Sequence, residues 1–409
     1  MPLLNHQDPL AFRHANRLDL AVALADSRER LLRLAAAYAE CLPPDQTVRY
    51  TPEVNPPRWQ LGHAGWYEEF WLVRNPLRRF GERAPYHDAR GASLLPNADA
   101  LFDPARSTQA RRWHLDLPSP ARLRRYLEQV RERTFTLLET CDESDDALYP
   151  FRLAVLHADR LLEDWAAMGQ ALALPVGDGL EAHAPQAPQA DDGEIAQAAR
   201  RVEIGVAGGA FALDHERPAH AVELAAFNID RHCVSWARYL PFIEEGGYER
   251  QDLWSDAGWA WRQRHSAGRP RYLMREDGVW QRAAFAQWTP LVPTAPAVNL
   301  SRHEAEAWCR WAGRRLPTEA EWESAATAMA DDGFTWGQVR EWTASPFVPY
   351  EGFEPAPDRS LSMPLFDGRP VVRGASFAAS PRLRHPRARG ALAADRNDVF
   401  TGFRSCASA

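Results

Sequence analysis

The sequence predicts a mixed fold in which a helical bundle precedes an α+β domain that is dominated by loops. Three observations support this prediction. Residues 1–174 carry long apolar patterns at helical spacing, residues 175–200 are rich in Pro, Ala, Gln and acidic side chains, and residues 201–409 alternate short apolar runs with Gly-, Pro- and Trp-rich loops. These ranges predict a first domain, a flexible linker and a second domain.

Four segments of the first domain repeat apolar residues at the spacing of an amphipathic helix. They are residues 18–42, ended by Pro43-Pro44, residues 57–75, opened by Pro57 and closed by Pro76, a segment that begins near Pro120, and a segment from Pro150 to Pro175. Four such helices in one block predict a four-helix bundle. The connection from Asn75 to Ser119 is long and basic, and loops of this length are usually functional or mobile.

The pattern of apolar residues is different in the second domain. The short apolar runs are VEIGV (202–206), HAVELAAFNI (220–229) and RPVVRGASFA (369–378), and each predicts a strand. Residues 301–315, SRHEAEAWCRWAGRR, predict one clear helix. Short strands, much loop and few helices favour an irregular α+β domain.

Composition excludes several classes of function. The 409 residues carry a formal net charge of −7, so a nucleic-acid or anionic-membrane surface is not favoured. All 48 basic residues are arginine, and a chain without lysine forms neither a Schiff base nor a P-loop. The five scattered cysteines make no C-x-x-C pair, and no apolar run reaches the length of a membrane span. The first residues lack an uninterrupted apolar stretch, so we do not expect them to act as a signal peptide. We therefore expect a cytoplasmic protein that acts on a small molecule.

Short phrases in both halves resemble known families. In the second domain, RLPTEAEWE (315–323), EWT (341–343), RGASF (373–377) and GFR (402–404) resemble the formylglycine-generating-enzyme (sulfatase-modifying-factor) domain, which is C-type-lectin-like. In the first domain, WQLGHAGWYEEF (59–70) and RLAVLHADRLLED (152–164) resemble a DinB-like four-helix bundle. This order of domains is the layout of the ergothioneine-pathway sulfoxide synthases (EgtB type) and of the selenoneine synthases (SenA type).

The resemblance implies a reaction and its reactants. These enzymes use a mononuclear non-haem iron, with O2 as oxidant, to join sulfur or selenium to the imidazole carbon of hercynine. Residues 98–118 and 396–407 are more similar to the selenoneine branch. The implied cofactor is Fe(II), and the implied substrates are a hercynine-like betaine and a selenosugar or a thiol.

The resemblance also implies site residues. Three imidazoles hold the iron in these families, and an H-x-x-x-H pair supplies two of them from one helix face. His63 and His157 match ligand positions, whereas Leu161 stands where the second histidine of the pair is expected. The place of the family's acid tyrosine begins at Asp358, so the catalytic residue is unknown. The residues expected at the substrate are Trp342, Phe347, Arg396, Asp398 and Phe400.

These departures leave three hypotheses open. The chain is a working enzyme with an atypical ligand set, a catalytically impaired paralogue (pseudoenzyme) that binds a small betaine, a carboxylate or a partner protein, or a binding module. In the first case, His87 or His114 of the long loop is an alternative third donor.

The resemblance also implies two geometric expectations. The imidazole rings of His63 and His157 are expected within ~8 Å of each other, the reach of two metal bonds. Arg373 and Arg404 either bind buried carboxylates of the fold or grip a substrate carboxylate. Arg396 is expected to reach the substrate.

Overall fold

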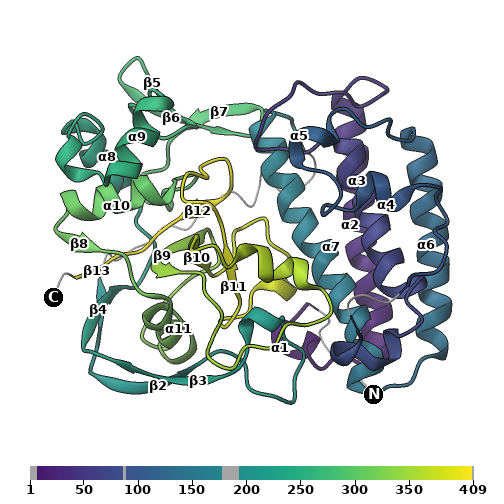
Figure 1. Ribbon diagram of the computed structural model, residues 1–409. Helices are drawn as coiled ribbons and strands as arrows, with labels where there is room; N and C mark the ends of the chain where they lie inside the picture. The colour runs from purple at the N-terminus through teal and green to yellow at the C-terminus, as the bar shows by residue number, and fades with distance from the viewer. Residues whose placement is uncertain (1–6, 86–88, 177–192, 408–409) are drawn as a thin grey trace. The chain divides into compact units, whose positions relative to one another are not determined.

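The computed structural model describes residues 7–85, 89–176 and 193–407, which form two compact units (Figure 1). Unit 1 contains Met1–Gly177 and two short later segments, Ala356–Arg359 and Ala379–Leu383. Unit 2 contains Asp178–Pro355, Ser360–Ala378 and Arg384–Ala409. Unit 1 is helical and unit 2 mixes helices with small sheets, which confirms the predicted fold class.

Four long helices build the bundle of unit 1 (Figure 1). They are α2 (Arg17–Cys41), α3 (Pro57–Glu68), which continues as the π-helix η1 (Glu69–Val73), α6 (Pro120–Thr140) and α7 (Asp145–Ala171). Shorter pieces connect them: α1 (Pro9–Phe12), η2 (Arg78–Arg83), α4 (Ala98–Phe102) and α5 (Gln109–Arg112). Helix α2 packs along α7, and α3 packs along α6, so the apolar stripes meet inside the bundle.

The start of α7 corrects one expected boundary. The sequence predicts a helix that begins at Pro150, but the helix begins five residues earlier, after Ser144. The Ser144 hydroxyl accepts from the Ala147 amide, and Asp145 and Asp146 place negative charge in the first turn, where the helix dipole favours it. These start signals outweigh the cost of a proline in the second turn.

A fully buried arginine ties a segment of the second half of the sequence to the bundle. Arg382 belongs to the 3₁₀ turn η8 (Pro381–Leu383), which packs against α7 within unit 1. Its guanidinium donates to both carboxylate oxygens of Asp159 at 2.7 and 2.9 Å, to Asp26 at 2.8 Å and to Ser27 at 2.8 Å. The sequence analysis places this segment in the second domain, whereas it is part of unit 1.

Unit 2 contains four small sheets in the described part of the chain. The first sheet has the order β1 (Glu194–Gln197), β4 (Phe227–Asp230), β13 (Cys406–Ala407), β8 (Arg314–Arg315). The second has the order β11 (Arg389–Ala391), β10 (Pro370–Arg373), β9 (Arg340–Pro346), β12 (Thr401–Gly402). A hairpin pairs β2 (Arg200–Ile204) with β3 (His220–Leu224), and β5 (Leu273–Glu276), β6 (Val279–Ala284) and β7 (Gln287–Pro290) form a meander. The predicted strands around 202–206 and 369–378 are thus present, whereas the run 220–229 forms two strands, β3 and β4, that belong to different sheets.

Unit 2 has more helices than the sequence analysis predicts. Besides α10 (Arg302–Trp311), which matches the predicted helix, it contains α8 (Trp236–Glu244), α9 (Asp256–Arg264) and α11 (Glu319–Ala328). Pro241 inside α8 and Gly258 inside α9 weaken the helical signal of these short segments. Their serine and threonine caps, which bond to the first turn, are the local signal that identifies them.

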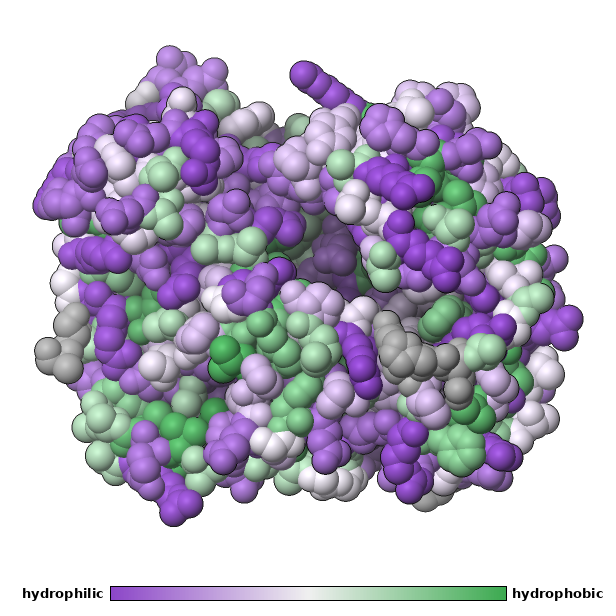
Figure 2. Space-filling model, viewed as in Figure 1, coloured by the Kyte–Doolittle hydropathy of each residue, from purple (hydrophilic) through white to green (hydrophobic). Residues whose placement is uncertain are grey.

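The predicted linker at 175–200 is described only in part. Residues 177–192 lie outside the described residues, and Glu194–Gln197 forms the strand β1, which pairs antiparallel with β4. Hydrophilic residues cover much of the face shown in Figure 2, and hydrophobic ones form scattered patches. Within the described ranges, every helix is too short or too polar to span a bilayer.

Candidate functional site

His63 lies on α3 in a box of aromatic rings, with only 8% of its surface exposed. Its ring stacks on Trp59 at a centroid distance of 4.8 Å and on Trp66 at 5.6 Å. Nδ1 lies 2.9 Å from the Phe102 carbonyl oxygen, which can only accept, so Nδ1 carries the proton and donates. The lone pair of the ring is therefore on Nε2, the arrangement found in metal-binding histidines.

His157 on α7 faces His63 across the bundle. The two ring centroids are 5.1 Å apart and the ring planes cross at 69°, within the expected separation. Burial lowers the pKa of His63 to about 4 and lowers the pKa of His157 well below its ordinary value. Both imidazoles are therefore neutral near pH 7, which is the protonation state that binds metals.

Tyr67 joins this pair, and the sequence analysis does not predict it. It follows His63 by one helical turn on the same face of α3. Its ring lies flat on His157, with centroids 3.4 Å apart and planes 2° from parallel, and its hydroxyl donates to Asp358 at 2.6 Å. Burial, reinforced by the Asp358 charge, raises the pKa of Tyr67 well above its usual value, so the group stays a phenol. The i+4 spacing from His63 is the signal that could have identified it.

The donors present do not complete a three-imidazole iron site. Leu161, one turn after His157, is buried and offers no lone pair. Among residues 7–85, 89–176 and 193–407, no group of three His, Cys, Asp or Glu side chains is placed to hold a metal ion. His114 is exposed, and His87 lies outside the described residues. The two neutral imidazoles supply two of the three donors that the family resemblance implies for iron, and the described residues do not supply the third.

The aromatic residues expected at the substrate lie in the interior of unit 2. Trp342 is fully buried, and its indole donates to the Leu300 carbonyl at 2.7 Å. Phe347 is also buried and packs on Phe366 with ring centroids 5.1 Å apart. Phe400 packs on Phe377 at 4.5 Å. These three rings therefore pack as core residues.

The arginines differ in their surroundings. Arg373 is fully buried and donates to Glu323 at 2.5 Å, and Arg404 is fully buried and donates to Glu341 at 2.5 and 2.9 Å. These contacts support the structural alternative for both residues, because a buried charge requires a partner of opposite sign.

Arg396 is in a more open position. Its side chain is 34% exposed and forms two hydrogen bonds, of 2.5 and 2.7 Å, with the buried carboxylate of Asp398. The two hydrogen bonds fix the orientation of the Arg396 guanidinium, while about a third of the side chain remains exposed to solvent.

Comparisons with known proteins agree with this architecture. Residues 23–169 match the DinB superfamily, and residues 190–339 match the sulfatase-modifying factor enzyme 1-like domain. Over 95% of its length, the chain is 32% identical to the hercynine oxygenase of Mycolicibacterium thermoresistibile (94% of that protein) and 31% identical to that of Mycolicibacterium smegmatis (98%). The formylglycine-generating enzyme of Streptomyces coelicolor is 33% identical over 34% of this chain and 51% of its own.

Proposed function

The chain belongs to the hercynine oxygenase family, and on that premise we propose that it is an oxidoreductase that joins selenium or sulfur to the imidazole ring of hercynine, with O2 as oxidant. The observation that carries the proposal is the pairing of two neutral, buried imidazoles 5.1 Å apart, His63 and His157, at the positions that the family resemblance assigns to iron ligands. The five free cysteines support the expected cytoplasmic location.

In this proposal, His63 and His157 are the only described residues that bind the iron. We assign Fe(II) to His63 and His157, with the remaining positions left to substrate, water or a donor outside the described residues. Two protein donors hold a metal weakly compared with three. The proposal therefore expects an iron that is lost easily on purification.

We propose selenium rather than sulfur as the transferred element. The support is the similarity of residues 98–118 and 396–407 to the selenoneine branch. The first segment contributes the Phe102 carbonyl that fixes the His63 ring, so the segment touches the candidate site itself. The second contains Arg396, which we propose as a contact to the carboxylate of hercynine, and Asp398, whose buried carboxylate holds that guanidinium in place.

The test is a reconstitution assay on the full chain. Protein loaded with Fe(II) without oxygen is mixed with hercynine, O2 and either a selenosugar or a thiol, and mass spectrometry detects the coupled imidazole product. We expect product with the selenosugar, a large loss in His157→Ala, and little change in His114→Ala, which removes an exposed loop histidine. Product that is equal in His157→Ala and wild type would contradict the assignment.

A second candidate function rests on Leu161. A leucine in place of a ligand favours a pseudoenzyme that binds the betaine without turnover. This candidate predicts that hercynine raises the melting temperature of the iron-free protein while no coupled product forms under any of the conditions above. Product formation from the same preparation excludes it.

A further inference from the structure

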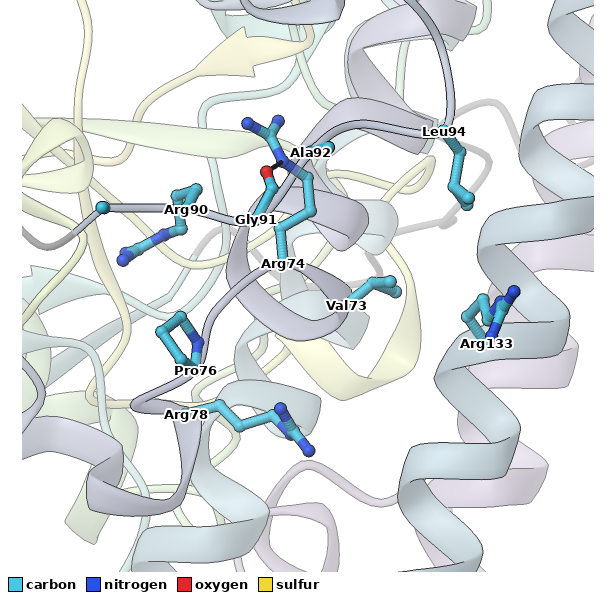
Figure 3. A pocket seen from close by; sticks show the side chains of 10 residues that line it. Val73, Arg74, Pro76, Arg78, Arg90, Gly91, Ala92, Leu94 and Arg133 are labelled. Atoms are coloured by element: carbon cyan, nitrogen blue, oxygen red, sulfur yellow. Dashed lines mark hydrogen bonds between the residues drawn. The ribbon is translucent and has the colours of Figure 1, made fainter.

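A cavity of about 390 Å³ opens on the helical unit away from any residue assigned above (Figure 3). Four of its ten lining residues are arginines, none is acidic, and the others are apolar or glycine. The arginines are Arg74, Arg78, Arg90 and Arg133, and we call this cavity the arginine pocket. Much of its wall comes from the long basic connection after Asn75, whose length is typical of a functional or a mobile loop.

Two of the arginines are held firmly in the wall. Arg74 donates to both oxygens of Asp99 at 2.7 and 2.8 Å, and its Nε donates to the Gly91 carbonyl at 2.7 Å. Arg90 lies over the ring of Phe70, with its guanidinium carbon 4.6 Å from the ring centroid. Groups fixed before a ligand arrives lose little conformational entropy when it binds.

The other two arginines bring charge that is not balanced nearby. Arg78 donates to the Asn75 carbonyl, and Arg133 is exposed on α6. Within the described parts of the chain, neither forms an ion pair with an acidic side chain. An arginine on an ordinary solvated helix face is usually interspersed with acidic neighbours, whereas this pocket gathers positive charge around one hollow.

We propose that the arginine pocket binds the phosphate group of a small molecule. The four arginines come from four separate segments, so they line the hollow from different sides: Arg74 follows the π-helix η1, Arg78 belongs to the 3₁₀ turn η2, Arg90 to the loop at 89–94 and Arg133 to α6. A tetrahedral dianion accepts hydrogen bonds from several directions, whereas a planar carboxylate is satisfied by one bidentate arginine. The apolar side chains of Val73 and Leu94 provide a surface for the body of such a ligand.

The pocket is linked to the candidate site through hydrogen bonds and stacking. Asp99, which holds Arg74, also accepts from the Trp66 indole at 2.7 Å. Trp66 in turn stacks on His63 with ring centroids 5.6 Å apart. A ligand that engages Arg74 therefore acts on a residue three contacts away from His63. The proposal itself does not depend on the proposed function, because it concerns binding alone.

The test is isothermal titration of the full chain with inorganic phosphate at constant ionic strength, with glucose 6-phosphate and succinate as further probes. We expect saturable binding with one site per chain. Binding should weaken roughly tenfold in Arg133→Gln and in Arg78→Gln, because each loses a charge-assisted hydrogen bond. Arg124→Gln is the matched control, since Arg124 is an exposed arginine on the same helix outside the pocket.

Three results overturn the proposal. The first is binding that is absent or unsaturable in the wild type. The second is an equal loss in Arg124→Gln and Arg133→Gln, which indicates general surface charge. The third is tighter binding of succinate than of phosphate, which assigns the pocket to dicarboxylates. Unchanged melting temperatures of the variants exclude unfolding as the cause of weaker binding.

Discussion

The phenol ring of Tyr67 lies flat on the imidazole of His157, with ring centroids 3.4 Å apart. The hydroxyl of the same side chain donates a hydrogen bond to Asp358, which follows it by 291 positions in the sequence. Residues 356–359 thus reach the bundle core as part of unit 1, at the segment where the family resemblance places an acid tyrosine. This chain also has a tyrosine next to that segment, but the tyrosine is Tyr67 of helix α3 and not a residue of the segment itself.

Replacing Tyr67 with phenylalanine should destabilise the protein by about 1–3 kcal/mol, because the buried Asp358 carboxylate loses a donor. Urea unfolding of the full chain measures the change. Tyr50→Phe is the control, because the Tyr50 side chain is half exposed. A loss below ~0.5 kcal/mol in Tyr67→Phe, equal to the control, would show that the bond contributes nothing to stability.

Leu161→His should increase the iron content of the protein. The new imidazole lies one turn after His157 on the same helix face and supplies the missing third donor. Metal analysis after loading with Fe(II) and desalting is expected to give well under one iron per chain for wild type and close to one for the variant. Leu162→His is the control, since the neighbouring side chain, also buried, projects about 100° away around the helix. Equal iron in the two variants would contradict the geometry.

Arg382→Met should cost about 3–5 kcal/mol, because it leaves the fully buried Asp159 without its cation. Denaturant unfolding measures the loss. Adding Asp159→Asn should recover part of it, since the uncompensated charge is then removed as well. The control is Arg33→Met, whose exposed pair with Glu29 contributes no more than ~0.5 kcal/mol. The idea fails if the double variant is less stable than Arg382→Met alone.

The ion pair between Arg74 and Asp99 should make stability depend on pH. The hydrogen bonds from Arg74 lower the pKa of Asp99, so its contribution is present above the unfolded value near ~3.9 and is lost as the pH falls through the folded value. Asp99→Asn should therefore reduce the melting temperature clearly at pH 7 and progressively less as the pH falls below ~3.9. Asp116→Asn, at an exposed position, should show no such difference. A constant effect of Asp99→Asn across this range contradicts the argument.

Local signals explain what the sequence could predict. The long helices of the bundle follow from apolar periodicity, and the closeness of His63 and His157 follows from two phrases placed on facing helices. The predicted start of α7 at Pro150 is wrong, because Ser144 and two aspartates determine where the helix begins. Periodicity reports which face of a helix is buried, but a cap depends on single residues.

Contacts between distant segments explain what could not be predicted. Tyr67 becomes a site residue only when α7 brings His157 against it, and Arg382 becomes a core residue only when η8 reaches Asp159. The arginine pocket likewise depends on how a loop folds back on η1 and α6. Of these residues, only Tyr67 has a local signal, its i+4 spacing from His63 on α3. No spacing in the sequence indicates the contact of Arg382 with Asp159 or the walls of the arginine pocket.

The burial of Arg382 in the bundle restricts how a gene of this kind can be divided. A gene divided within the codons for 177–192 encodes the bundle without Arg382, so the buried carboxylate of Asp159 loses the cation that pairs with it. A recombined chain that joins this bundle to a second half from another gene is expected to keep the bundle stable only if that second half supplies an equivalent arginine. The two halves are therefore expected to be inherited together rather than exchanged as independent parts.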